Sequence, residues 1–183
     1  MGRNEMNAPK ITAAHYSKGR GGHKPRLIVI HTMETPESPA RAKQVATWFA
    51  GHTAPQASAH YCVDDKQIYE CVDEADTAWA VDDFDLNQQS ISIELAGSAS
   101  QTFPQWNDLY SHKQMILVVA LVADIANRNG IPLARVSGAD ILTKSGICGH
   151  VDVTIAKHVQ GGHTDPGKNY PYTALIERAK AIK

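Results

Sequence analysis

Hydrophobic residues form short continuous runs in some parts of the chain and follow helical periods in others. The strongest short run covers residues 26–31 (RLIVIH) and is rich in branched side chains, which is typical of a strand buried on both faces. Similar runs predict further strands at residues 59–63, 67–72, 90–95 and 147–151. The pattern therefore predicts a sheet with at least one strand in its interior.

Longer segments predict helices between these strands. The first covers residues 40–50, with Ser38 as N-cap and Pro39 at the first helical position. The second covers residues 104–129, and its second half is apolar almost all round, so we expect a central packed helix. The third covers residues 172–183 at the end of the chain.

The alternation of strands and helices predicts an α/β fold: a single domain with a mixed central sheet flanked by helices. We expect this domain at residues 26–183, after an N-terminal arm at residues 1–25 that has no hydrophobic period. Residues 152–171 contain several glycines and prolines and are expected to form a long irregular loop. Because long loops in compact domains are commonly functional, this segment is a candidate for the site.

Composition excludes several classes of function. The chain has 183 residues, which suits one domain, and its net charge is −1. A near-zero charge argues against broad nucleic-acid binding and against polybasic attachment to membranes. The longest apolar run, residues 115–123, is far shorter than the roughly 20 residues that span a bilayer, so we expect no membrane insertion. Residues 1–10 lack the apolar segment of a secretion signal, so we expect the protein to be made in the cytoplasm. We also expect a monomer.

The cysteines do not predict a metal site or a disulfide. Cys62, Cys71 and Cys148 form no C-x-x-C pair. A short turn between the strands at residues 59–63 and 67–72 would place Cys62 opposite Tyr69, so we expect no bridge between Cys62 and Cys71.

Several side chains that can bind a metal lie near one another in the sequence. His150, His163 and Asp165 fall within the glycine-rich segment, and His31 ends the strongest strand, at the edge where α/β proteins place ligands. A catalytic zinc ion takes three protein ligands and leaves one position for water. From the residues alone, a structural role for His31 and for His150 stays open, as does the choice between His163 and Asp165 as third ligand.

Six sequence blocks occur in the order of a known family. They are RLIVIHTMET, SAHYCVDDKQIYECV, AW, NQQSISIELAG, ICGHVDV and GGHTDPG. This series resembles the zinc N-acetylmuramoyl-L-alanine amidases, a family that includes phage endolysins and peptidoglycan-recognition proteins, over residues 25–180. In style it is most similar to endolysins of actinobacterial phages. The resemblance implies a peptidoglycan-recognition-protein-like fold and one bound zinc ion.

The resemblance also assigns roles to individual residues. It implies that His31, His150 and Asp165 are the zinc ligands and that Glu94 is the general base or proton shuttle. His163 stands where the family often has lysine, which implies a role in stabilising the oxyanion or in donating a proton. The implied substrate contacts are Trp79, Asn87 and His60. For each of these three a structural role is an equal alternative: packing for Trp79, holding a turn for Asn87, and packing or a hydrogen bond beneath the metal site for His60.

The activity that the resemblance implies is hydrolysis of the amide between N-acetylmuramic acid and L-alanine in peptidoglycan. The partners would be the glycan strand and its stem peptide, and we expect a phage endolysin that acts on the bacterial cell wall during lysis. The alternatives are a cytosolic amidase that recycles soluble cell-wall fragments, a peptidoglycan-binding module without catalysis, and a general zinc peptidase.

Overall fold

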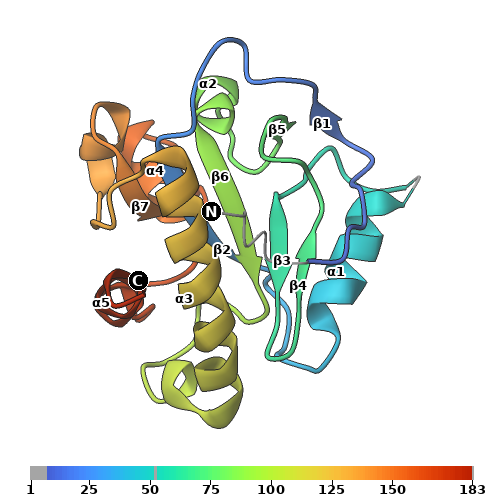
Figure 1. Cartoon of the computed structure of the whole chain (residues 1–183), viewed down its shortest axis with the longest axis vertical. Coiled ribbons are helices and arrows are strands. Elements are labelled where there is room, and N and C mark those ends of the chain that lie inside the picture. Colours follow the sequence, from blue (N-terminus) through green and yellow to red (C-terminus); the bar gives the residue numbers. More distant parts are fainter. Residues whose placement is uncertain (1–7, 52, 183) are drawn as a thin grey trace.

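The computed structural model describes residues 8–51 and 53–182. Within these residues the central sheet has the strand order β4-β3-β6-β2-β7 (Figure 1). The strands are β2 (Leu27–Thr32), β3 (Tyr61–Val63), β4 (Ile68–Glu70), β6 (Ser90–Leu95) and β7 (Gly146–Gly149). Strands β3, β6, β2 and β7 run parallel, whereas β4 pairs antiparallel with β3 at one edge. The predicted mixed sheet is confirmed.

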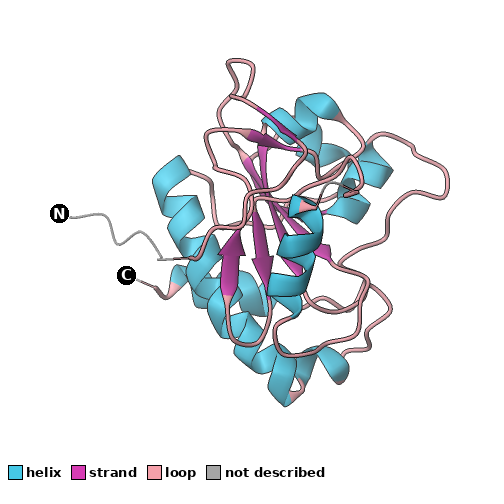
Figure 2. Ribbon diagram, turned by 90° about the vertical axis from the view of Figure 1, so that its right-hand side faces the viewer, coloured by secondary structure: helices cyan, strands magenta, loops and turns pink. Residues whose placement is uncertain are grey.

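Helices cover both faces of this sheet (Figure 2). One face carries α3 (Leu109–Asn129) and α5 (Tyr172–Lys180), and the other carries α2 (Phe84–Gln88) and α4 (His150–Ala156). Helix α1 (Arg41–Ala50) packs on β3 and β4. The predicted single α/β domain with flanking helices is therefore confirmed.

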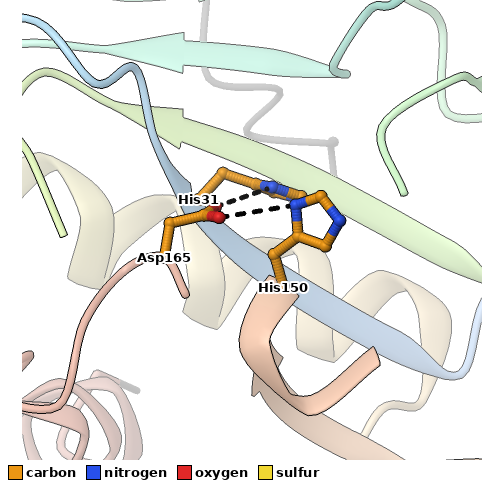
Figure 3. Close-up of side chains that lie close together, drawn as sticks. All are labelled: His31, His150 and Asp165. Carbon is orange, nitrogen blue, oxygen red and sulfur yellow. Dashed lines mark ion pairs between the residues drawn. The ribbon is translucent and has the colours of Figure 1, made fainter. Parts of the chain in front are cut away.

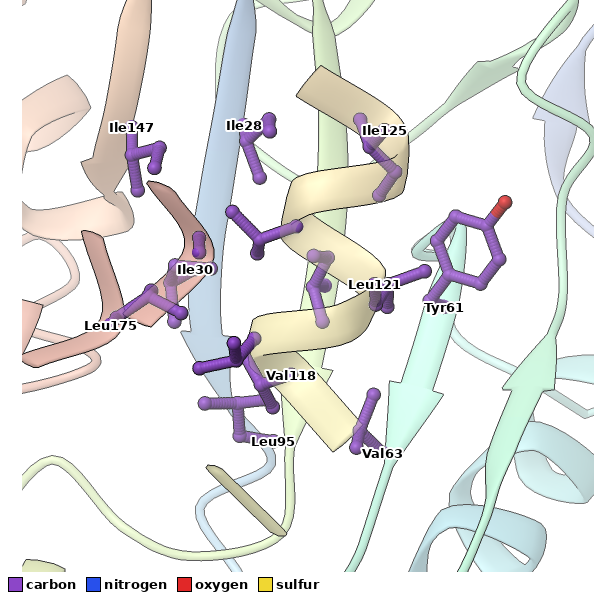
Figure 4. Packing of buried hydrophobic residues seen from close by; sticks show 14 of the residues in the cluster. Ile28, Ile30, Tyr61, Val63, Leu95, Val118, Leu121, Ile125, Ile147 and Leu175 are labelled. Atoms are coloured by element: carbon purple, nitrogen blue, oxygen red, sulfur yellow. The ribbon is translucent and has the colours of Figure 1, made fainter. Parts of the chain in front are cut away.

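Strand β2, which has a neighbour on each side, divides its side chains between the two faces of the sheet. Ile28 and Ile30 belong to the core beneath α3, and Leu27 and Val29 belong to the core beneath α4. Figure 4 shows the first of these cores, in which β2, β6 and β7 pack against α3 and α5. Because side chains alternate along a strand, His31 leaves the sheet on the α4 side.

Helix α3 is the central packed helix that the sequence predicts. By length and composition alone it could also cross a membrane, but half of its most hydrophobic window is buried inside the protein. Its α-helical part begins at Leu109, later than predicted, because the Asp108 side chain accepts a hydrogen bond from the Ser111 N–H and caps the helix there. A 3-10 turn, Gln105–Asn107, precedes it.

The predicted start of the first helix is wrong. Helix α1 begins at Arg41, and its N-cap is Ala40, which adopts a left-handed conformation with φ 67°. Ser38 does not cap with its side chain; its carbonyl oxygen accepts hydrogen bonds from the Arg41 N–H and the Tyr110 hydroxyl.

The expectation of an irregular loop at residues 152–171 is also wrong for the first part of this segment, because α4 runs from His150 to Ala156. Asp152 stabilises the start of this helix: its buried carboxylate accepts hydrogen bonds from the Gly149 N–H (2.7 Å) and the Gly138 N–H (3.0 Å). The predicted strand at residues 147–151 is accordingly shorter and ends at Gly149. Helix α2, capped by Asp83, was not predicted.

The described part of the N-terminal segment packs on the domain. Strand β1 (Tyr16–Ser17) pairs with β5 (Thr77–Ala78) in a small second sheet. Arg20 is buried and donates hydrogen bonds to the carbonyls of Glu74, Gln88 and Ser90. Residues 1–7 of the expected arm lie outside the described residues, and the boundary at residue 25 stays a prediction.

The cysteine predictions agree with the structure. Cys62 lies opposite Tyr69 in the β3–β4 ladder. Cys62 and Cys71 are buried free thiols whose sulfur atoms are 3.7 Å apart.

Candidate active site

His31, His150 and Asp165 come together at the carboxyl end of the parallel strands (Figure 3). His31 lies near the end of β2, and His150 opens α4 directly after β7. Asp165 lies in the loop before α5, and its backbone carbonyl accepts a hydrogen bond from the Val151 N–H, which ties this loop to α4. All three side chains are buried.

The carboxylate of Asp165 lies between the two imidazoles. One of its oxygens is 3.2 Å from Nδ1 of His31, and the other is 3.5 Å from Nδ1 of His150. The two rings meet edge to face with centroids 4.8 Å apart. Two nitrogen donors and one carboxylate oxygen therefore converge from three segments that are far apart in the sequence.

The spacing of these atoms fits a tetrahedral zinc site. With zinc–ligand bonds of roughly 2.0–2.2 Å, neighbouring ligand atoms in a tetrahedron lie about 3.3–3.6 Å apart. The two oxygens of Asp165 lie 3.2 and 3.5 Å from the two histidines, near this separation, and one ligand atom from each of the three residues lies within 4.8 Å of the others. Three protein ligands also leave a fourth position open, which is the arrangement of catalytic rather than structural zinc.

The protonation states of this group suit a metal as well. Burial and the neighbouring His31 ring lower the pKa of His150, so its imidazole is neutral near pH 7. For Asp165, burial favours the neutral acid, but hydrogen bonds from His150 and His31 outweigh it and hold the pKa well below its usual range. An ionised carboxylate beside a neutral imidazole is the form in which these groups bind a metal.

A second possible metal group shares His150 with His163 and Asp82. The rings of His150 and His163 are stacked almost parallel, with centroids 4.0 Å apart and planes 10° apart. A metal ion binds in the plane of an imidazole, and two parallel planes this far apart cannot both contain one ion. The geometry therefore favours His31, His150 and Asp165 as the ligand set.

Glu94 stands directly beside His31 in the sheet. The two residues are register partners on β6 and β2, so their side chains leave the same face about 4.8 Å apart. Ile93 and Leu95 point into the opposite core, as the sequence alternation predicts. Burial, with the charges of Asp165 and Glu34, raises the pKa of Glu94 to about 8. Its Oε2 atom is buried without a hydrogen-bond partner among the described residues.

His163 lies on the solvent side of the group and is about half exposed. Its Nδ1 atom is 3.5 Å from Asp165, and its Nε2 atom is 3.8 Å from Asp82. The sequence does not predict that Asp82 lies near His163. Asp82 belongs to a short acidic segment before α2, and such a segment is typical of a solvent-exposed loop. His163 therefore lies beside His150 and Asp165, with about half of its side chain exposed to solvent.

His60 is fully buried beneath β6. Its Nδ1 atom accepts a hydrogen bond from the Ser92 N–H (3.0 Å), and its Nε2 atom lies 2.8 Å from the Arg20 guanidinium. Burial and the charge of Arg20 lower the pKa of His60 to about 3. These contacts give His60 a structural role, and a direct contact with substrate stays a prediction.

Asn87 uses its whole side-chain amide to hold a turn. Its oxygen accepts hydrogen bonds from the Ala80 and Val81 N–H groups, and its nitrogen donates to the Val81 carbonyl. The side chain is buried, so it corresponds to the turn-holding alternative. Contact with substrate stays a prediction for Asn87 too.

Trp79 follows β5 and is partly exposed. Its indole N–H donates to the Ser17 hydroxyl (2.9 Å), and its ring stacks on His15 at 6.0 Å between centroids. The N-terminal segment therefore fixes the orientation of Trp79. Its contact with substrate stays a prediction.

The fold and the site together define a class: a mixed-sheet domain with a buried His-His-Asp group at the carboxyl edge of its parallel strands. The N-acetylmuramoyl-L-alanine amidase family matches residues 21–168, so the chain belongs to this family. Family membership supports an enzyme that hydrolyses an amide of peptidoglycan. No curated protein matches the sequence.

Several solved structures have the same fold. Staphylococcus aureus hydrolase AmiA in complex with its ligand is 17% identical, with a TM-score of 0.66 over 94% of this chain and 82% of that chain. AmpD is 20% identical, with a TM-score of 0.66 over 95% of this chain and 94% of that chain. The endolysin N-acetylmuramoyl-L-alanine amidase LysCS from Clostridium intestinale is 15% identical, with a TM-score of 0.63 over 98% of this chain and 99% of that chain. At these identities the likeness concerns the fold alone.

Proposed function

We propose that this protein is a zinc-dependent amidase that cleaves the bond between N-acetylmuramic acid and L-alanine in peptidoglycan. Its biological role would be that of a phage endolysin, acting as a monomer on the cell wall during host lysis. The observation that carries the proposal is the buried group of His31, His150 and Asp165, whose candidate ligand atoms lie within 4.8 Å of one another and which supplies the two imidazoles and one carboxylate of a catalytic zinc site.

His31, His150 and Asp165 would hold the zinc ion. When bound, the ion would lower the pKa of a water molecule and polarise the scissile carbonyl. The role of the chain would be to present two imidazoles and one carboxylate in a buried position. The pKa directions of His150 and Asp165 favour this state.

Glu94 would accept a proton from the attacking water and pass it to the departing nitrogen of L-alanine. A general base works best when its pKa lies near the working pH, and burial raises the pKa of Glu94 to about 8. A cation held by His31 would favour the ionised, proton-accepting form of this neighbouring carboxylate.

His163 would donate a hydrogen bond to the oxyanion that forms on the scissile carbonyl. Its exposed ring beside His150 and Asp165 supports this role, because the substrate must approach from the solvent side. A single donor of this kind typically contributes about 2.7–4 kcal/mol to stabilising the transition state.

Mass spectrometry of digested peptidoglycan tests the proposal. Wild-type protein loaded with zinc should release stem peptides that begin with a free L-alanine amino group, and Asp165→Ala should release none. Asp140→Ala removes an exposed aspartate away from the site and serves as the matched control. Cuts between amino acids would indicate a peptidase instead, and absence of both new amino termini and bound zinc would indicate a binding module.

The same preparation separates lysis from recycling. An endolysin should clear a suspension of intact sacculi, whereas a recycling amidase should act on soluble muropeptides and leave sacculi turbid. If the turbidity of the sacculi does not change while soluble fragments are cleaved rapidly, the lytic role is contradicted. The proposed amidase activity would not be contradicted by that result.

A further inference from the structure

Glu34 lies three residues after His31, in the loop that leaves β2, and has a strained backbone. Its φ is 48°, in the left-handed region, although the residue has a side chain. This conformation is unfavourable for any residue other than glycine, and it persists only where surrounding contacts hold it. Strain of this kind is common beside functional sites. The contacts of the Glu34 side chain show what holds the strained conformation here.

The Glu34 carboxylate joins the loop after β2 to the loop after β6. Its Oε1 atom accepts hydrogen bonds from the Thr32 hydroxyl (2.6 Å) and the Ala99 N–H (2.8 Å). Its Oε2 atom accepts one from the Ser98 hydroxyl (3.1 Å). Hydrogen bonds to a carboxylate are stronger than those between neutral groups, so one side chain holds both loops in place.

The loop after β6 in turn supports the segment that carries Asp165. A Cβ atom built on Gly167 would overlap the carbonyl oxygen of Ala99, so the two backbones are in close contact. The Gly167 N–H donates to the Thr164 carbonyl (3.0 Å), which closes a turn around Asp165. Ala99 therefore contacts Glu34 through its N–H and the Asp165 turn through its carbonyl.

We propose that Glu34 is a positioning residue, which fixes the strand end that carries His31 relative to the turn that carries Asp165. The inference rests on the proposed function, in which these two side chains hold one zinc ion. The connection runs from Thr32, which follows His31, through Glu34 to Ala99 and from there to the Asp165 turn. In this role Glu34 contacts neither the metal nor the substrate.

The hydrogen bonds of Glu34 also distinguish it from the proposed base, Glu94. Both oxygens of Glu34 accept hydrogen bonds, whereas Oε2 of Glu94 is buried without a partner among the described residues. A base must keep an oxygen free for the proton that it accepts. The contacts of Glu34 therefore suit the holding of loops, and those of Glu94 suit proton transfer.

Zinc affinity of the metal-free protein, measured by competition with a chelator, tests the inference. Residues that orient metal ligands typically contribute about 10–100-fold to metal affinity, and Glu34 acts through an intervening loop, so Glu34→Ala should bind zinc about tenfold more weakly than wild type. Glu34→Gln keeps the length of the side chain and an oxygen acceptor for Thr32 and Ala99. This variant should bind zinc nearly as tightly as wild type.

A glycine variant separates positioning from stability. Glu34→Gly removes the same hydrogen bonds as Glu34→Ala but adopts φ 48° without strain. It should therefore unfold at a higher urea concentration than Glu34→Ala and still bind zinc as weakly.

Glu74→Ala is the matched control. Glu74 also accepts hydrogen bonds from three side chains, those of Tyr61, Arg128 and Asn129, none of which belongs to the candidate site. This substitution should lower stability against urea and leave the zinc affinity at the wild-type value.

Cobalt(II) bound in place of zinc reports the geometry of the ligands through its visible absorption. The bands of wild type and Glu34→Gln should coincide. In Glu34→Ala they should shift or weaken, because the Asp165 turn is no longer held in the same place. A loss of global stability alone would not change the spectrum of the folded, cobalt-loaded protein.

Each outcome has a distinct meaning. Unchanged zinc affinity in Glu34→Ala and Glu34→Gly would overturn the inference, as would an affinity that follows urea stability across these variants and Glu74→Ala. A raised KM in Glu34→Ala with unchanged zinc affinity would assign Glu34 to substrate binding and overturn it too. These results leave the proposed amidase activity intact. A wild-type protein that binds no zinc would overturn the proposed function, and the role of Glu34 with it.

Discussion

Gly167→Ala should displace the loop that carries Asp165. Gly167 has φ +89°, and a Cβ atom built on it would overlap the carbonyl oxygen of Ala99 and lie 2.8 Å from the carbonyl carbon. Carbon atoms in ordinary contact are about 3.5–4.0 Å apart, so the contact with the carbonyl carbon alone requires the loop or Ala99 to move by at least about 0.7–1.2 Å. Because both neighbours are backbone, no side-chain rotation can relieve the overlap.

The expected cost of this substitution has two parts. A non-glycine residue with left-handed backbone costs about 1–2 kcal/mol, and forced overpacking costs about 1–3 kcal/mol more. Gly161→Ala is the matched control, since it has φ +65° in the same region but no atom within 4 Å of the new Cβ. Urea unfolding should therefore show a loss of about 2–5 kcal/mol for Gly167→Ala and only about 1–2 kcal/mol for Gly161→Ala.

The displacement should also impair the metal site. Asp165 lies two residues from Gly167, and a misplacement of about 1 Å in a catalytic group lowers activity on the order of a hundredfold. Zinc affinity measured against a competing chelator should fall in Gly167→Ala and stay at the wild-type value in Gly161→Ala. Equal stability and equal zinc affinity in the two variants would refute the argument that the Ala99 contact fixes the Asp165 loop.

Three other predictions concern single residues. Glu94→Gln should lower kcat by about 10²–10⁴ with unchanged zinc content, measured by steady-state kinetics and metal analysis. Asp152→Ala should lower the free energy of unfolding by about 2–4 kcal/mol, because the buried Gly149 N–H and the partly buried Gly138 N–H lose their acceptor and Arg135 loses its ion-pair partner, whereas Asp140→Ala should change it by less than about 0.5 kcal/mol. Stability should fall as pH drops from about 6.5 toward 3, since His60 stays neutral in the fold, with a pKa of about 3, but binds a proton when unfolded. The slope from this residue is about 1.4 kcal/mol per pH unit, and His60→Gln should show a flatter dependence in urea titrations at several pH values.

Much of the sheet follows from local patterns. Residues 27–30 between Arg26 and His31 are all apolar, and β2 is an interior strand with neighbours on both sides. The alternation around Glu94 predicts which side chains face the core, and the register places Glu94 beside His31. These features depend on the two-residue period of a strand, which is visible in the sequence as the alternation of side chains along it.

The ends of helices depend on contacts that local patterns do not contain. Helix α4 is short and contains Val151 and Val153, which favour strands, so its sequence resembles an extension of β7. Its N-terminus is stabilised by Asp152, whose carboxylate also accepts from Gly138 in a distant segment. Local preference was therefore overridden by a tertiary contact.

A groove between Glu94 and helix α1, lined in part by Arg41 and Trp48, could not be predicted from the sequence for a similar reason. Arg41 and Trp48 lie more than forty residues before Glu94, and an arginine and a tryptophan on an amphipathic helix are ordinary surface residues in a sequence. Only the packing of α1 against β3 and β4 brings them to the carboxyl edge of the sheet. The residues of the buried His-His-Asp group, by contrast, stand in sequence blocks that resemble a family, so this group could be named in advance.

The central claim is that His31, His150 and Asp165 hold one zinc ion. The most direct test is an anomalous difference map, recorded at the zinc absorption edge, from crystals of the zinc-loaded protein. We expect one strong peak about 2.0–2.2 Å from a nitrogen of each histidine and an oxygen of the aspartate. A peak bound by other side chains, or no peak at these three residues in fully loaded protein, would contradict it.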